Sequence, residues 1–171
     1  MIVQGGYPVP VVHPIDPIWD EHSKILILGS FPSVRSREAG FYYAHPQNRF
    51  WPVLAAVFSS ETPGDIPSRR AFALAHGVAL WDVIHSCEIT GSSDASIRNV
   101  VPNAISSLLS QTSIKKIFCN GKRAYDLYCR YLAEDTGMDA ILLPSTSPAN
   151  AAWNLNRLIQ AWKIIDEKGE P

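Results

Sequence analysis

Four short apolar runs recur along the chain, and each one ends in glycine or in polar residues. Unbroken apolar runs of this length, without alternating polar positions, are typical of strands that are buried on both faces. Such strands belong to parallel sheets that carry helices on each side. We therefore predict a central parallel sheet. Its strands are expected at residues 24–29, 77–84, 114–121 and 139–145.

The segments between these runs have the periodicity of amphipathic helices. In the clearest of them, Trp51, Leu54, Ala55 and Phe58 repeat at helical spacing, and Pro52 stands near the helix start. Strands that alternate with helices predict right-handed βαβ units and the α/β fold class. The expected helices span residues 51–58, 69–76, 102–110, 124–132 and about 150 to 165.

The chain of 171 residues has the length of one domain, since about 150 residues is usual for a single domain. Four prolines and two adjacent glycines fall within residues 1–23. This composition predicts an extended N-terminal arm with little regular structure, whose apolar residues are available to pack on the body. Residues 24–171 are then expected to form the single α/β domain.

Composition and charge exclude several classes of protein. The 15 basic and 16 acidic residues give a formal charge of -1, so no basic field holds nucleic acid by bulk charge alone. The three cysteines form no C-x-x-C pair, which argues against a disulfide scaffold or a cysteine-rich metal site. No apolar run approaches 18 residues, so we expect no membrane span. Prolines interrupt the N-terminal stretch, which is unlike a signal peptide.

Polar residues directly follow each predicted strand. In parallel sheets, ligands bind beyond the carboxyl ends of the strands, so these positions are site candidates by geometry alone. We expect Ser30 and Ser147 to lie at the same edge of the sheet. The candidate segments are residues 29–33, 82–86, 120–121 and 145–150.

Three segments of the chain allow both a functional and a structural interpretation. The loop 29–33 matches neither a dinucleotide fingerprint nor a P-loop, and an ordinary βα turn also explains it. In the aromatic stretch 41–51, Asn48 could simply cap the next helix, and Arg49 could simply be solvated. The loop 144–150 opens the last predicted helix, where free N–H groups suit a phosphate, but Ser147 could equally cap that helix.

Three motifs become specific when they are taken together and in order. Gly-Ser-Phe-Pro-Ser follows the first run, His-Pro-Gln-Asn-Arg-Phe-Trp precedes the next helix, and Ser-Thr-Ser-Pro-Ala-Asn follows the last run. In this order they resemble the uracil-DNA glycosylase superfamily, and most of all its hypoxanthine-DNA (DNA-deoxyinosine) glycosylase branch. The sequence Leu-Trp-Asp-Val-Ile at 80–84 resembles the same branch. The resemblance covers residues 24–165.

The resemblance implies a three-layer α/β/α sandwich with a central four-stranded parallel sheet. It also implies a monofunctional hydrolase in base excision repair, which flips a deaminated base out of DNA and cleaves its N-glycosidic bond. Hypoxanthine is the preferred substrate and uracil the second. The expected partner is DNA that contains deaminated bases, with no membrane, metal or cofactor. The protein is expected to be a monomer in the cytoplasm or at the nucleoid.

Asn48, His45 and Asp82 are the expected catalytic residues. Relatives have a water-positioning asparagine where this chain has Phe31, and the resemblance makes Asn48 the nearest replacement, with a helix cap as the alternative. In that alternative, water activation passes to His45, Asp82 or the backbone. Asp82 lies near where several relatives read uracil with an asparagine. Its carboxylate could accept the N1–H of hypoxanthine, or it could orient a neighbour, since it would repel a developing anion.

The same motifs imply the residues that bind the base and the DNA. Tyr43 matches the aromatic that stacks on the flipped base, and Ser145 stands where many relatives have a histidine that supports the leaving base. Charge stabilisation is therefore expected from backbone N–H groups or from other side chains. The expected substrate-binding residues are Gly29, Ser30, Phe31, Tyr43, Ser145 and Ser147. The expected DNA contacts are Arg35, Arg37 and Arg49 at phosphates, and Pro148, Ala149 and Asn150 in a loop that enters the minor groove.

Two other functions stay open on the sequence. A non-catalytic module that binds nucleic acid or a nucleotide on the same fold would explain why Phe31 and Ser145 replace the usual residues of the relatives. A small-molecule hydrolase of the doubly wound type would need a nucleophile elbow, and the chain has no G-x-S-x-G sequence. Incubation with duplexes that contain inosine, uracil or xanthine separates these functions.

Overall fold

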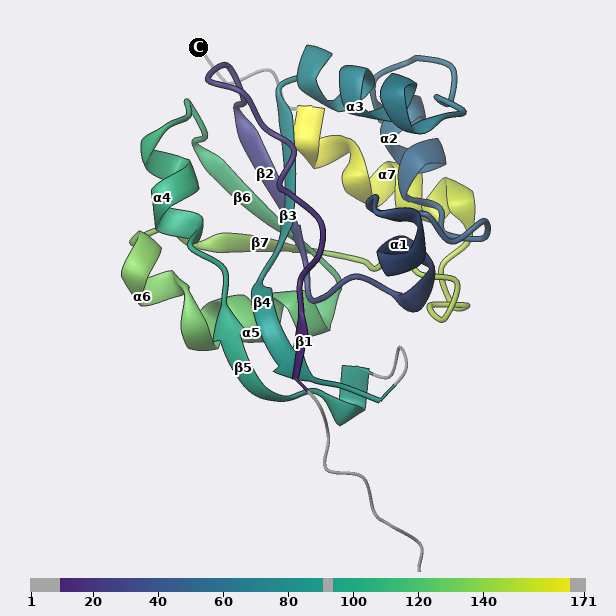
Figure 1. Ribbon diagram of the computed structural model, residues 1–171. Coiled ribbons are helices and arrows are strands. Elements are labelled where there is room, and N and C mark those ends of the chain that lie inside the picture. Colours follow the sequence, from purple (N-terminus) through teal and green to yellow (C-terminus); the bar gives the residue numbers. More distant parts are fainter. Residues whose placement is uncertain (1–9, 91–93, 167–171) are drawn as a thin grey trace, which may run out of the picture.

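A computed structural model of the chain describes residues 10–90 and 94–166. Its main sheet has four strands in the order β3-β2-β6-β7, and every neighbouring pair is parallel (Figure 1). The strands correspond to the four apolar runs, so the predicted sheet is confirmed. Their bounds are β2 Ile25–Gly29, β3 Val78–Asp82, β6 Lys116–Asn120 and β7 Ala140–Leu143.

Helices cover both faces of this sheet (Figure 1). Ile25 and Ile27 of β2 point into one hydrophobic core, whereas Leu26 and Leu28 point into the other. This alternation is what a strand buried on both faces requires, and it confirms the three-layer sandwich. The first core is closed by α2 (Phe50–Val57), α3 (Ile66–Ala75) and α7 (Leu155–Trp162), and the second by α4 (Ile105–Ser110) and α5 (Lys122–Tyr131), which is followed by α6 (Ala133–Thr136).

Two of the predicted helices begin later than expected. The last helix was expected from about residue 150, but α7 begins at Leu155, because the Asn154 side chain caps it by accepting from the Arg157 N–H at 2.8 Å. The helix expected over 102–110 begins at Ile105, because Pro102 ends a strand. A one-turn helix, η2 (Lys163–Asp166), follows α7.

A second, three-stranded antiparallel sheet was not predicted. Its order is β1-β4-β5, and it lies below the main sheet in Figure 1. The apolar run at 77–84 therefore contains two elements, because β3 ends at Asp82 and the chain turns at Val83 into β4. The strands are β1 Pro10–Val12, β4 Ile84–Glu88 and β5 Arg98–Pro102, and η1 (Asp94–Ser96) precedes β5.

The part of the expected N-terminal arm that is described packs closely on the body; residues 1–9 lie outside the described ranges. Residues 10–12 form β1, the His13 N–H donates to the His85 carbonyl at 2.6 Å, and Ile18 forms an antiparallel bridge to Leu80 of β3. Ile15 and Ile18 are buried in the first core. Residues 10–23 are therefore a structural part of the domain.

A short helix that was not predicted, α1 (Val34–Ala39), follows the first loop. Ser33 caps it by accepting from the Ser36 N–H at 3.2 Å. Among the described residues, none of the helices combines the length and the apolar composition needed to cross a membrane.

Candidate active site

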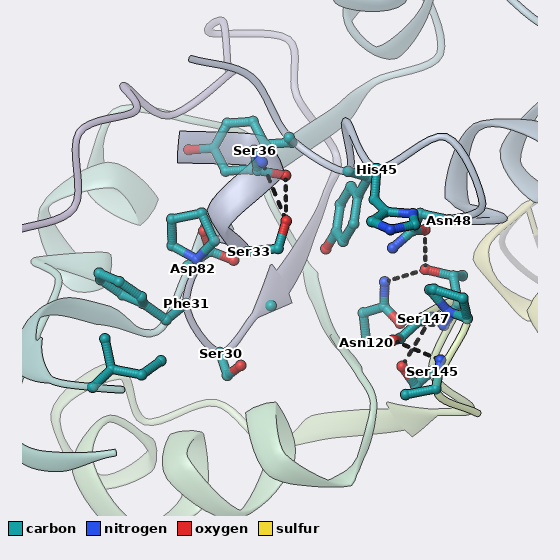
Figure 2. A pocket seen from close by; sticks show the side chains of 18 residues that line it. Ser30, Phe31, Ser33, Ser36, His45, Asn48, Asp82, Asn120, Ser145 and Ser147 are labelled. Carbon is teal, nitrogen blue, oxygen red and sulfur yellow. Dashed lines mark hydrogen bonds between the residues drawn. The ribbon is translucent and has the colours of Figure 1, made fainter. Parts of the chain in front are cut away.

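A cavity of about 420 Å³ opens at the carboxyl edge of the main sheet (Figure 2). Each strand delivers a polar residue to it: Ser30 follows β2, Asp82 ends β3, Asn120 ends β6 and Ser145 follows β7. Ser147 lines the same cavity as Ser30. The expectation that these residues meet at one sheet edge is confirmed.

Most of the predicted site residues surround this cavity. Asn120 and Thr146 also line it, although the sequence pattern assigned them no role. Arg35, Arg37, Arg49 and Asn150 were predicted as DNA contacts and lie outside the lining. The predicted residues that do line it are Gly29, Ser30, Phe31, Tyr43, His45, Asn48, Asp82, Ser145, Ser147, Pro148 and Ala149.

The Asn48 side chain serves the fold and the cavity at the same time. Its Oδ1 accepts two hydrogen bonds, from the Phe50 N–H at the start of α2 and from the Thr146 hydroxyl, both at 2.9 Å. These bonds fix the orientation of the amide, because both lone pairs of the oxygen are used. The Nδ2 group makes no hydrogen bond to a described residue. Asn48 therefore offers the cavity two donors and no acceptor.

Thr146 connects this amide to the end of β6. The threonine is fully buried, and its hydroxyl accepts from Asn120 Nδ2 at 3.0 Å while donating to Asn48. The Thr146 N–H donates to Asn120 Oδ1, also at 3.0 Å. The chain therefore holds three polar side chains from distant segments in one network. The only sequence signal for Asn120 is a polar residue at the end of an apolar run.

His45 lies beside Asn48 at one side of the cavity, while Asp82 and Phe31 lie at the other side (Figure 2). The Nδ1 of His45 accepts from the Gln47 N–H at 3.1 Å. A nitrogen that accepts a hydrogen bond carries no proton, so the neutral ring carries its proton on Nε2. Like Asn48, the neutral His45 ring therefore has a donor to offer.

Tyr43 is held in a strained backbone conformation beside the cavity. Its φ of 54° lies in the left-handed region, which costs a residue other than glycine about 1–3 kcal/mol. One face of its ring stacks on buried Phe50, with centroids 4.0 Å apart and an interplanar angle of 19°. The Tyr43 hydroxyl is buried and makes no hydrogen bond of normal geometry to a described residue.

The environment keeps the Tyr43 phenol protonated. Burial raises its pKa well above the usual value, and the negative charge of Asp82 raises it further, against a smaller lowering by the Asn120 side chain. A buried hydroxyl without a partner is costly in a folded protein, and such groups deserve a functional explanation. Tyr43 therefore combines an aromatic face with an unused donor.

Asp82 is held by a histidine that the sequence did not single out. His13 Nε2 lies 2.7 Å from Asp82 Oδ2, and the two side chains are only 2% and 5% exposed. Asp82 Oδ1 stands directly over Gly29, where a β-carbon would lie 2.4 Å from that oxygen. Any side chain at position 29 would therefore displace the carboxylate. A lone histidine in a proline-rich segment carries no recognisable motif.

Arg49 has a different role from the predicted phosphate contact. Its guanidinium donates to the carbonyls of Thr146 at 3.4 Å, Ser147 at 2.8 Å and Asn150 at 3.1 Å, and also to that of Trp153. Most of its donors are thus used within the protein. Arg49 clamps the loop that follows β7, and we correct its assignment accordingly.

The clamped loop has no helix start at Ser147. The Ser147 hydroxyl accepts from the Ala149 N–H at 3.2 Å, which is a local turn and not a cap of α7. Asn150 Nδ2 donates to the Ser145 carbonyl at 2.9 Å, so this side chain also shapes the loop. Pro148 and Ala149 are exposed at the rim of the cavity.

The remaining predicted arginines lie on α1, beside the cavity. Arg35 is exposed, and the Arg37 guanidinium stands 5.6 Å from the centre of the Phe31 ring. Phe31 itself is 8% exposed and packs edge-on against His13, with centroids 5.9 Å apart. Phe31 therefore supports the histidine that holds Asp82.

The cysteines are remote from this chemistry. Cys87 and Cys119 are buried, Cys129 is exposed, and burial raises the pKa of Cys119 to about 12. Within residues 10–90 and 94–166, no three His, Cys, Asp or Glu side chains gather in a group that could hold a metal ion.

Comparison with known proteins supports the resemblance noted in the sequence. The model of the uracil DNA glycosylase superfamily matches residues 17–166. A protein named hypoxanthine DNA glycosylase from Methanosarcina acetivorans is 31% identical over 166 residues, which are 96% of this chain and 98% of the relative. Another protein of that name, from Methanosarcina barkeri, is 32% identical over 138 residues, which are 78% of this chain and 85% of the relative.

A solved structure agrees with these matches. It is the solution NMR structure of a Methanosarcina acetivorans protein that is provisionally assigned as a uracil DNA glycosylase. The TM-score is 0.76 at 29% identity, with 88% of this chain and 93% of that chain covered. The expected enzyme class, a hydrolase of N-glycosidic bonds, is confirmed at the level of the family. The chain belongs to the uracil DNA glycosylase superfamily.

Proposed function

We propose that this protein is a monofunctional DNA glycosylase that removes deaminated bases from DNA, hypoxanthine first and uracil second. The observation that carries the proposal is the donor wall formed by Asn48 and His45. Deamination replaces an exocyclic amino group, which donates, with a carbonyl oxygen, which accepts. N–H donors at this wall can bind the carbonyl oxygen of a deaminated base. The amino group of adenine or cytosine would instead face another donor.

The same donors support bond cleavage. When the N-glycosidic bond breaks, the electron pair stays on the base and negative charge spreads to its carbonyl oxygen. Donors that are already oriented toward this charge stabilise the transition state without any reorganisation. Asn48 is suited to this role because its two internal hydrogen bonds hold the amide in place. We therefore assign Asn48 Nδ2 and His45 Nε2 to the base that leaves.

The preference for hypoxanthine has a simple geometric basis. Hypoxanthine presents two neighbouring acceptors, O6 and N7, whereas uracil presents O4 beside a carbon. Two adjacent donors, from Asn48 and His45, match the purine better. Two relatives that cover most of this chain are named hypoxanthine DNA glycosylase, which supports the same order of substrates. The cavity of about 420 Å³ falls in the size range of small-ligand sites.

Access to the cavity requires that the nucleotide leaves the duplex. We assign the free face of Tyr43 to stacking on the flipped base, because Phe50 covers the other face. Pro148 and Ala149 at the rim enter the minor groove and fill the space that the base leaves. Arg35 and Arg37 on α1 contact phosphates. The protein acts as a monomer, on DNA in the cytoplasm or at the nucleoid.

The nucleophile in this proposal is water. No lysine is found among the cavity-lining residues of the described chain, so the lining offers no amine for a Schiff base. Borohydride should therefore trap no covalent enzyme–DNA adduct. A trapped adduct would show that the enzyme also acts as a lyase.

The function is tested by base release from matched duplexes. Single-turnover reactions with deoxyinosine, deoxyuridine, deoxyxanthosine or the undamaged bases are followed by alkaline cleavage at abasic sites. We expect the fastest release from deoxyinosine, slower release from deoxyuridine, and none from deoxyadenosine or deoxycytidine. Binding of the inosine duplex without any release would instead identify a non-catalytic binding module.

A further inference from the structure

The buried pair of His13 and Asp82 has no part in the donor wall. The segment that carries His13 is anchored at three places: β1 pairs with β4, Ile18 bridges to Leu80, and the Tyr42 hydroxyl donates to the Asp16 carbonyl at 3.0 Å. These anchors deliver His13 from the N-terminal segment to the end of β3. The position of the imidazole is thus set by tertiary contacts on both sides of it.

Hydrogen bonds define the tautomer of His13. The Ile15 N–H donates to Nδ1 at 3.2 Å, and a backbone N–H can only donate. The proton of the neutral ring is therefore on Nε2, from which it is donated to Asp82 Oδ2 at 2.7 Å. His13 in this state holds one oxygen of the carboxylate and leaves Asp82 its negative charge.

The other oxygen of Asp82 lies above Gly29, at the lining of the cavity. A β-carbon on Gly29 would lie 2.4 Å from Asp82 Oδ1 and 3.3 Å from the Tyr43 hydroxyl, so both oxygens border the same point above the glycine. A water molecule in the cavity beside Asp82 can hydrogen-bond to its carboxylate. The Asp82 carboxylate would accept a hydrogen bond from this water.

Other strong acceptors of the cavity are already in use. Asn48 Oδ1 accepts from a hydroxyl and an N–H, and Asn120 Oδ1 accepts from the Thr146 N–H. His45 Nδ1 accepts from the Gln47 N–H. Asp82 contributes the one carboxylate among the described residues that line the cavity. A proton that leaves an attacking water therefore has one well-placed destination.

We propose that the Asp82 carboxylate holds the attacking water in the cavity, and that His13 is the positioning residue that fixes Asp82 for this task. The inference rests on the proposed glycosylase function. The bond from the sugar C1′ to the base nitrogen breaks, and its electron pair leaves with the base. The water oxygen bonds to C1′, and its proton passes to Asp82 and then to solvent. The base takes a proton from solvent, so the products are an abasic site and the free base.

This assignment separates the charges of the transition state. The sugar becomes positive and the base becomes negative as the bond breaks. Asp82 faces the sugar in our assignment, while Asn48 and His45 face the base from the other side of the cavity (Figure 2). The arrangement removes the difficulty of a carboxylate beside a developing anion, because the carboxylate and the anion lie at opposite ends of the reacting bond.

Variants at position 13 test the positioning role. His13→Gln keeps an amide donor near the place of Nε2, whereas His13→Leu keeps the size and removes the donor. Ile18→Val is the matched control, because it loosens the same segment without touching Asp82. Each variant is assayed by single-turnover release of hypoxanthine from an inosine duplex, with the maximal rate and the half-saturating enzyme concentration fitted separately. The melting temperature of each is measured in parallel.

We expect His13→Leu to lower the maximal rate by about 10²-fold, the usual effect of misplacing a reacting group, with half-saturation unchanged. His13→Gln should recover most of that rate even where it melts as early as His13→Leu. Asp82→Asn should lose at least as much as His13→Leu, and the double variant should lose no more than Asp82→Asn alone, since both act on one unit.

The outcomes separate this inference from the proposed function. Parental rates in His13→Leu or in Asp82→Asn would overturn the inference and leave the glycosylase function in place. Equal rate losses in His13→Gln and His13→Leu would show that His13 has only a structural role, and they would also overturn the inference. A parental protein that releases no base from any duplex would overturn the proposed function, and this inference with it.

Discussion

Two substitutions at Asn48 separate its structural role from its chemical role. Asn48→Ala removes both hydrogen bonds that Oδ1 accepts at 2.9 Å, from the Phe50 N–H and from the Thr146 hydroxyl. Each such bond contributes about 1 kcal/mol, so the loss is about 2 kcal/mol in the free energy of unfolding. For a chain of this length that corresponds to a drop of about 4–8 °C in the melting temperature. The donor is lost at the same time.

Asn48→Asp has a different profile. The aspartate keeps an acceptor oxygen in the place of Oδ1, so both internal hydrogen bonds remain and the helix start stays capped. We expect its melting temperature within about 2 °C of the parent, which is less than 1 kcal/mol. The second oxygen replaces the two donors of Nδ2. Loss of a donor that faces a developing anion lowers the rate about 10²–10³-fold. The carboxylate that Asn48→Asp introduces is itself negative, so it does not compensate for the lost donor.

The assay is single-turnover release of hypoxanthine at about pH 8, where an ordinary carboxyl is ionised, at a temperature well below both melting points. Thr146→Val is the matched control, because it breaks the same internal network without removing the Asn48 amide. It should melt earlier and keep a rate within a few-fold of the parent. If Asn48→Asp released the base at the parental rate, the donor wall would play no part in catalysis. Asn48 would then be a helix cap only.

Three further outcomes follow from the same contacts. Tyr43→Ala should weaken binding to an inosine duplex by about 1–3 kcal/mol, the cost of one lost base–aromatic stack, whereas Tyr43→Phe should bind as the parent does in a fluorescence titration. Arg49→Gln should lower the melting temperature by several degrees, because Arg49 clamps the loop after β7. Its excision rate should fall about tenfold on duplex DNA but little on single-stranded DNA, because that loop fills a gap only in a duplex. Equal losses of rate on both substrates would contradict this. Burial raises the pKa of Tyr42 and Tyr43, and the negative charge of Asp82 is the second cause. The folded protein therefore keeps two phenol protons that the unfolded chain releases above about pH 10. The free energy of unfolding from urea titrations should therefore fall as the pH rises above about 10, and fall less in Tyr43→Phe.

The main sheet could be predicted because its signal is local. A strand buried on both faces needs several consecutive apolar residues, and β2 and β6 follow this rule. The edge strand β7 is also a run of apolar residues, although Leu142 is exposed. Parallel connection through helices then places all carboxyl ends at one edge. That topology brought Ser30, Asp82 and Ser145 to one cavity before any side-chain contact was known.

The errors in element bounds have non-local causes. Residues 98–102 form a strand because they pair with β4, and no apolar run marks them. The last helix begins at Leu155 because Arg49, far away in the sequence, holds the preceding carbonyls in a loop. In both cases the backbone groups found partners that the local pattern does not name.

The sequence by itself determined the layers of the fold, the edge at which the site lies and most of the residues that line it, because the periodicity of apolar residues and the alternation of strands with helices can be recognised in short stretches of chain. Tertiary structure alone decided what those residues can do. It turned the Asn48 amide so that only donors face the cavity, and it brought His13 across the sheet edge to Asp82. What a polar group can donate or accept depends on its hydrogen-bond partners. Thr146 lies 98 residues from Asn48 along the chain, and His13 lies 69 residues from Asp82.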